Sequence, residues 1–329
     1  MQATRRSRSA IGRRSKQSSS SLPAQGLTIA PIERLSLRND RRRIEQIFEG
    51  ALAHPLIVTD ATTDWPAFGK WGLSYFAQAY GSHLGLAPLN FGARAMPGRA
   101  TTLKVFIENL GKPYSALPGV WVGNDQRAAA DEPLGWSFAW EPFKSAPELI
   151  DDVSPFPAAI ANMTASLPKD VYDALQEIHR RRFHAIYISR AGTVTPIHTD
   201  WHHTMGCLAQ FEGRKDFIVF PPAGDDKAEE SGFDPENPDF DRFPAMRGRL
   251  AYSSVLQPGE MLIIPPDWPH YARSIDHTVT LSHNFFNSTN LAAFMRCVEA
   301  DAAGSAKKAK LLEEVSAHLR LDRRARPHS

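Results

Sequence analysis

Cysteines and long apolar runs are scarce in this sequence. Two of its 329 residues are cysteines, too few for a fold built on disulfides, so a reducing compartment is the default expectation. No segment approaches the roughly 18 consecutive apolar residues that a membrane-spanning helix needs, and the first residues lack the apolar centre of a secretory signal. These absences predict a cytoplasmic protein that does not contact a membrane.

Charge is spread unevenly along the chain. The formal net charge is +2, yet residues 1–20 contain six basic and no acidic side chains, and residues 307–329 contain seven basic and three acidic ones. The region between them therefore carries a net charge of about −8. Residues 1–28, rich in Arg and Ser, are predicted to form a disordered basic tail. A contact with nucleic acid or another acidic surface and a transit peptide are the alternative interpretations.

The first half of the chain mixes short helical and extended patterns. Ile44, Ile47, Phe48 and Leu52 fall on one face of a helix predicted over residues 41–53. A buried strand is predicted over 55–59 and helices over 73–80 and 170–180, whereas the Gly-, Pro- and Ala-rich segment 92–145 is predicted to be irregular.

From residue 183 onward, short apolar strands follow one another with Gly and Pro turns between them and no helices. This succession predicts a mainly β fold with flanking helices, built as an antiparallel barrel or sandwich. The acid-rich stretch 225–241 is predicted to be a surface excursion. The strands are predicted over 183–189, 208–211, 215–220, 260–264 and 278–283, and two final helices over 292–302 and 306–321.

Two histidines and one aspartate suggest a metal site. His198 and Asp200 are two residues apart at the predicted end of a strand, so their side chains leave the same face. His270 follows a Pro-Gly-Glu turn and an apolar strand about seventy residues later. Two histidines and a carboxylate form the facial triad that binds non-haem Fe(II) and leaves positions open for a co-substrate and O2. We therefore predict that these three residues bind a metal.

Longer motifs surround the three residues. Residues 194–200 (VTPIHTD), 210–222 (QFEGRKDFIVFPP) and 257–270 (QPGEMLIIPPDWPH) resemble the JmjC, or cupin-like, Fe(II)- and 2-oxoglutarate-dependent dioxygenases. Within that family they are most similar to the branch that contains the asparaginyl hydroxylase of hypoxia-inducible factor. The resemblance implies a double-stranded β-helix, or jelly-roll barrel. It divides the chain into a tail (1–28), a catalytic domain (29–290) and a C-terminal helical extension with a basic tail (291–329).

The resemblance also implies roles for single residues. The three predicted ligands His198, Asp200 and His270 would bind Fe(II). Lys215 would bind the distal carboxylate of 2-oxoglutarate, and Thr195 would donate a hydrogen bond to the same group. These residue types suit the task, because a dianion inside a barrel needs a cation and hydroxyl donors to offset its desolvation. The family also has an asparagine on its last barrel strand, which Asn284 matches.

One departure leaves the lysine assignment open. The stretch from Asp200 to Gly213 is about two residues longer than in the resembling family. When the register of a strand shifts by one residue, each of its side chains moves to the opposite face of the sheet. Arg214 is therefore the alternative to Lys215 as the basic residue that points into the barrel.

The implied function is that of a dioxygenase which uses Fe(II), 2-oxoglutarate and O2 to hydroxylate a C–H bond, with a protein or peptide side chain as the leading substrate. RNA and small molecules are alternative substrates, and demethylation is an alternative outcome. The helices after residue 290 are apolar on one side and would dock on the barrel or pair with a second copy. Two other classes are a cupin metalloenzyme that does not use 2-oxoglutarate and a non-catalytic binding module. The usual mark of such a module is a lost ligand, and all three are present.

Overall fold

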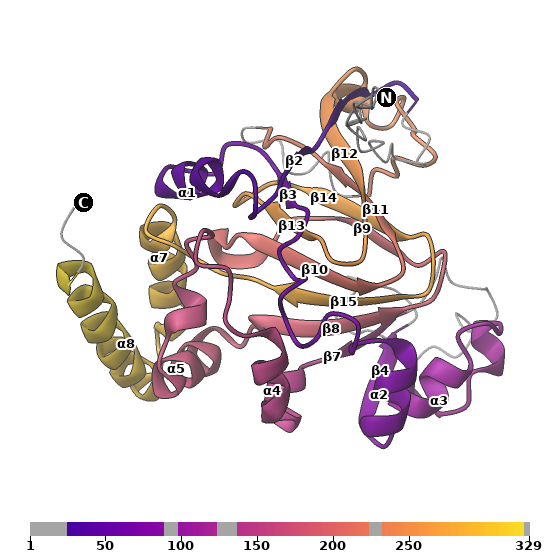
Figure 1. Cartoon of the computed structure of the whole chain (residues 1–329), viewed down its shortest axis with the longest axis horizontal. Helices are drawn as coiled ribbons and strands as arrows, with labels where there is room; N and C mark the ends of the chain where they lie inside the picture. The colour runs from indigo at the N-terminus through magenta and orange to yellow at the C-terminus, as the bar shows by residue number, and fades with distance from the viewer. Residues whose placement is uncertain (1–24, 89–97, 124–136, 224–231, 326–329) are drawn as a thin grey trace, which may run out of the picture.

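The protein is built around two large β-sheets that face each other, with helices on one side (Figure 1). The computed structural model describes residues 25–88, 98–123, 137–223 and 232–325. Most of the tail predicted at 1–28 and part of the excursion predicted at 225–241 lie outside the described residues. The predicted division into domains stays a prediction.

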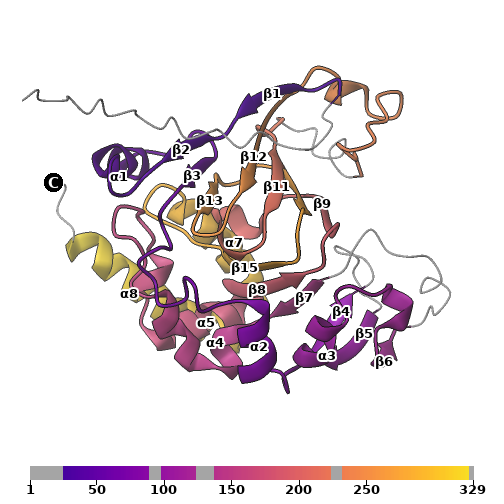
Figure 2. The same cartoon turned by 45° about the vertical axis from the view of Figure 1, so that its right-hand side comes forward.

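The strands form three sheets. The first runs in the order β1 (Thr28–Pro31), β12 (Leu250–Leu256), β11 (Lys215–Val219), β14 (His270–Ser274) and β9 (Val194–His198). The second runs in the order β2 (Glu33–Leu35), β3 (Leu56–Val58), β13 (Met261–Ile264), β10 (Gly206–Glu212), β15 (Thr278–His283), β8 (His184–Ser189) and β7 (Ser137–Trp140). The small third sheet, β4 (Leu84–Pro88), β5 (Gly98–Thr102) and β6 (Val120–Val122), lies at the edge of the molecule in Figure 2.

The α-helices of the described residues lie outside the two large sheets. They are α1 (Arg41–Glu49), α2 (Leu73–Ala79), α3 (Leu103–Glu108), α4 (Pro142–Ser145), α5 (Lys169–His179), α7 (Leu291–Ala302) and α8 (Ala306–Ala325). None of the helices in these residues is long and apolar enough to cross a membrane.

The two large sheets pack face to face as a jelly roll. Phe217 and Val219 of β11 meet Leu262 and Ile264 of β13 in one buried cluster between the sheets. Ile218, the residue between the first two, faces the other way into a separate cluster. This period of two is that of a strand buried on both faces. The mainly β fold with flanking helices that the sequence predicts is confirmed.

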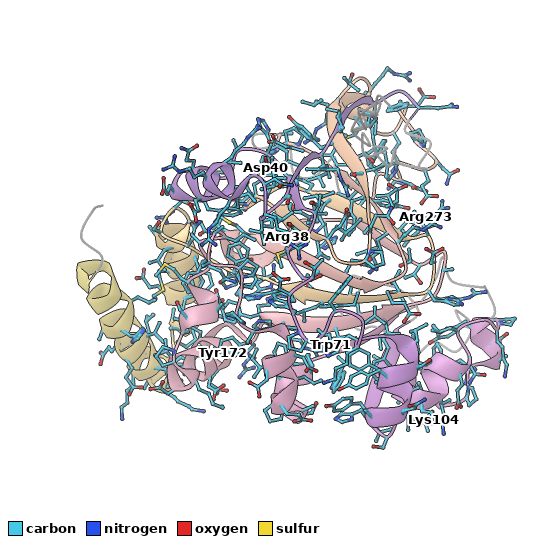
Figure 3. All side chains as sticks on the ribbon, viewed as in Figure 1. Arg38, Asp40, Trp71, Lys104, Tyr172 and Arg273 are labelled. Carbon is cyan, nitrogen blue, oxygen red and sulfur yellow. The ribbon has the colours of Figure 1, made fainter. Side chains whose placement is uncertain are left out.

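Helices α2 and α3 contribute side chains to the buried cluster on the outer face of the second sheet. Phe76 of α2 and Phe106 of α3 share a buried cluster with Cys207 of β10 and Ile263 of β13. Trp71, labelled in Figure 3 at the start of α2, belongs to the same cluster. The cluster as a whole buries the side of the second sheet that faces away from the barrel interior.

The C-terminal helices pack on the same chain. Leu175 of α5, Phe294 of α7 and Val315 of α8 are buried in one cluster. The apolar side predicted for the last two helices is thus covered, at least in part, by α5.

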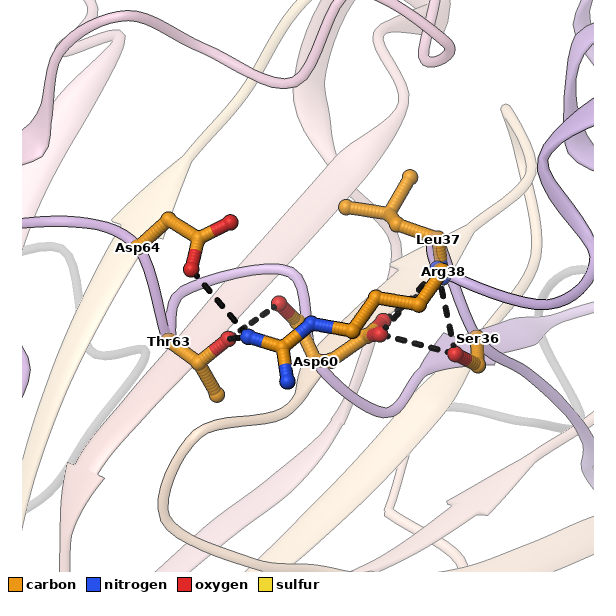
Figure 4. A network of polar contacts seen from close by, with 6 residues as sticks. All are labelled: Ser36, Leu37, Arg38, Asp60, Thr63 and Asp64. Atoms are coloured by element: carbon orange, nitrogen blue, oxygen red, sulfur yellow. Dashed lines mark hydrogen bonds and ion pairs between the residues drawn. The ribbon is translucent and has the colours of Figure 1, made fainter.

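A polar network joins the N-terminal strands to each other (Figure 4). The carboxylate of Asp60, just after β3, accepts hydrogen bonds from Ser36 Oγ at 2.7 Å and from Leu37 N at 2.6 Å. Arg38 Nη2 lies 3.2 Å from Asp64 Oδ1. These bonds fix the turn between β2 and α1 against the end of β3.

One sequence prediction is wrong. Within 92–145, predicted to be irregular, the described residues contain β5, α3, β6, β7 and α4. The helices predicted at 41–53, 73–80 and 170–180 and the strand predicted at 55–59 are present, with slightly different ends.

Candidate metal centre

The three predicted ligands come together at one end of the jelly roll. His198 ends β9, His270 begins β14, and the two residues lie opposite each other in the antiparallel pair. Their ring centroids are 4.2 Å apart. Asp200 follows shortly after β9, and one ligand atom from each of the three residues lies within 4.8 Å of the others. Two neighbouring strands therefore supply a converging donor set.

Both imidazoles have one nitrogen bonded to the backbone. Nδ1 of His198 lies 2.9 Å from the carbonyl oxygen of Pro196, and Nδ1 of His270 lies 3.0 Å from that of Trp268. A carbonyl only accepts, so each Nδ1 carries the proton and each Nε2 keeps its lone pair for a metal. With the carboxylate of Asp200, these two nitrogens fit the donor set of non-haem Fe(II).

The ligands differ in their access to solvent. His198 is exposed, Asp200 is half-buried and His270 is buried. Although the residue as a whole is exposed, desolvation by the protein atoms around its ring and, second, the adjacent His270 lower the pKa of His198 to about 4. The imidazole is therefore neutral near pH 7, as a metal ligand must be.

A bulge in β10 determines which basic residue points into the barrel. The pairing of β10 with β15 shifts register between Gln210 and Glu212, which absorbs one residue. Lys215 then begins β11 on the inward face, two residues before the inward-facing Phe217. Arg214 is exposed and bonds to Asp276 with its Nε and Nη2 atoms at 2.7 and 3.1 Å. The inward basic residue is Lys215.

Gln210 holds the bulge in place. Its Nε2 donates to the carbonyl oxygens of Glu212 at 2.7 Å and Gly213 at 2.9 Å. Its Oε1 accepts from Thr280 Oγ1 at 2.8 Å. The side chain is fully buried and all these bonds are inside the protein, so it fixes the turn from which Lys215 starts.

Lys215 is a buried cation. Its side chain is 6% exposed, and burial lowers its pKa to about 8. Among the described residues no carboxylate forms an ion pair with it, and its Nζ lies 6.0 Å from the ring centroid of Tyr187. A buried ammonium of this kind is costly unless an anion binds beside it.

The other two predicted co-substrate residues also belong to the barrel. Thr195 of β9 lies opposite Ala272 of β14, which faces the interior. Asn284 is buried just after β15, and its Nδ2 donates to Thr204 Oγ1 at 3.2 Å. Lys215 lies opposite Ser274, the next inward residue of β14 after Ala272. Thr195 therefore lies one inward-facing position nearer the metal ligands than Lys215 does. The binding roles of Thr195, Lys215 and Asn284 stay predictions.

Gly206 is a site residue that the sequence prediction missed. A Cβ added at Gly206 would lie 2.3 Å from Asp200 Oδ2 and 3.6 Å from the Cβ of Ile264. The absence of a side chain therefore lets the carboxylate sit against the backbone of β10. The signal lies in strand pairing, which brings Gly206 opposite Ile264, and no local motif encodes it.

We expect Gly206→Ala to displace the Asp200 carboxylate and to weaken metal binding by about tenfold or more, the range seen when groups that orient metal ligands are removed. Titration with Mn(II) or Co(II) measures the affinity. Gly111→Ala is the control, because a Cβ at Gly111 meets no atom within 4 Å. Equal affinities in both variants and the wild type would show that Asp200 tolerates the methyl group.

The remaining histidines near the ligands have other partners. His202 Nε2 lies 2.6 Å from Asp301 Oδ2, and His203 Nδ1 lies 2.6 Å from Asp267 Oδ2. His283 lies on the second sheet with its ring centroid 4.0 Å from that of His184. Among the described residues, none of these histidines belongs to the group of three that could hold a metal.

A jelly roll with two histidines and a carboxylate on adjoining strands has the architecture of a cupin-like metal protein. Residues 50–293 match the family of the cupin-like domain. This is well over half of the sequence, and the chain belongs to that family. The JmjC and cupin-like resemblance of the sequence motifs is thereby confirmed, whereas the similarity to the asparaginyl hydroxylase branch stays a prediction.

Curated relatives have names of the JmjC type. Lysine-specific demethylase JMJ30 of Arabidopsis thaliana is 26% identical over 280 residues, which are 79% of this chain and 57% of the relative. Lysine-specific demethylase 8 of Xenopus tropicalis is 25% identical over 241 residues, 69% of this chain and 47% of the relative. The 2-oxoglutarate and iron-dependent oxygenase JMJD4 of Homo sapiens is 28% identical over 138 residues, which are 40% of this chain and 32% of the relative. The chain spans about half the length of the first two relatives.

Proposed function

We propose that the protein is an Fe(II)- and 2-oxoglutarate-dependent oxygenase that acts on a protein side chain. The observation that carries this proposal is the combination, in one barrel, of the His198, Asp200 and His270 donor set with the buried Lys215, which forms no ion pair with any described residue. The donor set accounts for a divalent metal. The lysine accounts for an anionic co-substrate, because a bound carboxylate would offset the cost of burying the ammonium.

Each residue has a defined task in this proposal. The Nδ1 bonds hold the two imidazoles with Nε2 toward the metal, and Asp200 adds a charged oxygen. Lys215 binds the distal carboxylate of 2-oxoglutarate, and Thr195 donates a hydrogen bond to it. Fe(II) and 2-oxoglutarate, when bound, supply the oxidising chemistry together with O2, while the protein supplies position and a dry pocket. Asn284 contributes a polar side chain to the same interior.

The names of the relatives support a protein substrate. Two of them are called lysine-specific demethylases and one an oxygenase. Hydroxylation and demethylation both begin with oxidation of a C–H bond, so the site is compatible with either outcome. We favour hydroxylation of a side chain in a protein or peptide, in the cytoplasm. A homodimer through α7 and α8 is a weaker proposal, because α5 already covers part of the apolar side of these helices. RNA is the weaker proposal for the substrate, because two of these relatives are named for action on lysine.

The experiment that tests the function is succinate release from 2-oxoglutarate by the purified chain with Fe(II), ascorbate and O2, without added substrate. We expect slow turnover by the wild type and none by Asp200→Ala, with both proteins folded as judged by circular dichroism. A variant as active as the wild type would remove Asp200 from the donor set.

The two alternative functions predict other results. Metal binding that depends on Asp200, without binding of 2-oxoglutarate, would identify a cupin metalloenzyme of another kind. Binding of neither would identify a non-catalytic module. Isothermal titration with Mn(II), then with 2-oxoglutarate, separates these outcomes.

A further inference from the structure

The predicted metal ligands lie where the chain passes between the two large sheets. Residues 199–205, the first crossover, connect β9 in the first sheet to β10 in the second. Residues 265–269, the second crossover, connect β13 in the second sheet to β14 in the first. The first crossover begins after His198 and contains Asp200, and the second ends at His270. The pairing of β9 with β14 sets the separation of the two histidines, and the path of the first crossover sets where Asp200 lies relative to them.

One side-chain contact joins the crossovers. His203 Nδ1 lies 2.6 Å from Asp267 Oδ2. Both crossovers are fully described, and no other hydrogen bond or ion pair links residues 199–205 to 265–269. The second crossover has three prolines among its five residues, which lack an N–H group and so limit backbone bonding.

Both partners hold an unusual backbone conformation. His203 has φ 54° and Asp267 has φ 65°, in the left-handed region. With His202 at φ 55°, they are three of the four non-glycine residues with positive φ in the described chain. Such residues persist only where surrounding contacts hold them, and they concentrate at functional sites.

The neighbouring α7 supports the first crossover independently. Asn290 Nδ2, at the start of α7, donates to the carbonyl oxygen of His203 at 2.7 Å, and His202 bonds to Asp301 of α7 at 2.6 Å. The His202–Asp301 pair has the same residue types and atom separation as the His203–Asp267 pair. Its aspartate, however, lies on a helix that carries none of the three ligands.

We propose that the His203–Asp267 pair is a brace that fixes the first crossover, which contains Asp200, against the second crossover, which leads into His270, and so tunes the affinity of the metal site. The inference rests on the proposed function. The two residues are positioning residues and do not touch the metal. His203 lies three residues after Asp200 in the first crossover, so a contact that fixes His203 also limits the movement of Asp200.

Glycine variants separate this role from a purely structural one. Glycine adopts positive φ without strain. Asp267→Gly and His203→Gly therefore remove the side-chain contact and also remove the conformational strain of a non-glycine residue at positive φ. We expect the metal-free variants to unfold at the same temperature as the wild type or higher, and yet to bind Co(II) about tenfold more weakly, the lower end of the loss for groups that orient ligands. The double variant should bind no more weakly than either single one.

Two further variants complete the test on the full chain. Asp267→Asn keeps an acceptor oxygen and tolerates the left-handed conformation, so it should restore most of the affinity. Asp301→Ala removes the matched pair on α7 and should leave Co(II) affinity near that of the wild type. Glycine variants that bind Co(II) as tightly as the wild type would overturn the brace, and so would an equal loss in Asp301→Ala.

The same titration distinguishes failure of the brace from failure of the function. Asp200→Ala first establishes that Co(II) binds at the three ligands. Wild-type protein that does not bind Co(II), or binds it as well after Asp200→Ala, would overturn the proposed function and the brace together. Binding that depends on Asp200 but not on Asp267 would overturn the brace alone.

Discussion

Replacing Lys215 with methionine should make the ligand-free protein more stable at pH 7 and abolish its binding of 2-oxoglutarate. The side chain is buried, and burial lowers its pKa from 10.5 to about 8. Protonated lysine at pH 7 therefore carries a cost of roughly 3 kcal/mol, at about 1.4 kcal/mol for each pKa unit. Methionine fills a similar volume without a charge, and urea unfolding measures the gain.

The pH dependence of the gain has a definite sign. The folded pKa of Lys215 lies below the unfolded one, so the unfolded chain binds more protons between pH 8 and pH 10.5. Wild-type stability should therefore rise with pH across that window. The advantage of Lys215→Met should be full below about pH 8 and should shrink toward zero near pH 10.5.

Arg214→Met is the matched control for binding. Arg214 is exposed and bonded to Asp276, so its loss should leave the affinity for 2-oxoglutarate unchanged. Titration of the Mn(II)-loaded proteins with 2-oxoglutarate compares the variants. If Lys215→Met lowers the stability at pH 7 and still binds 2-oxoglutarate, the lysine has a structural role.

The orientation of Lys215 shows what sequence motifs can and cannot determine. The motif placed the lysine at the start of a strand, but the extra length after Asp200 left its facing undecided. In the structure, the bulge between Gln210 and Glu212 adds one residue before β11 and turns Lys215 inward. The bulge depends on bonds to a distant residue, such as the one from Thr280 to Gln210, and the local sequence does not contain them.

The small third sheet was missed for a related reason. β4 and β5 are rich in residues that rarely form strands, such as Gly and Pro. They are held by Tyr114, whose OH donates to Ala87 O at 2.7 Å and accepts from Arg99 N at 3.0 Å. This tertiary contact replaces local propensity in β4 and β5. β6 (VWV) consists of strand-favouring residues but has only three of them, too few for a clear strand pattern. The convergence of His198, Asp200 and His270, by contrast, follows from residue type, spacing and the motifs around them.

Acid should unfold the protein before its metal ligands can be studied at low pH. Burial lowers the pKa of His179 and of His184 to about 3, and burial with the adjacent His184 lowers the pKa of His283 well below 6.5. In the unfolded chain these groups return to about 6.5, so the unfolded chain binds more protons below that pH. Stability should therefore fall as the pH drops from 6.5 toward 3.

The expected loss is large. At pH 4.5 His179 and His184 together cost about 5 kcal/mol, at about 1.4 kcal/mol for each pKa unit, which is comparable with the whole stability of many domains. His184 Nδ1 lies 2.8 Å from Tyr172 Oη, and His184→Gln keeps an acceptor for that hydroxyl without a titrating ring. Urea unfolding between pH 4.5 and 7 gives the slope of the unfolding free energy against pH, which reports the number of protons taken up on unfolding. The variant should take up about one proton fewer than the wild type. Identical slopes would mean that His184 is already protonated in the folded protein, and burial would then not be what controls its charge.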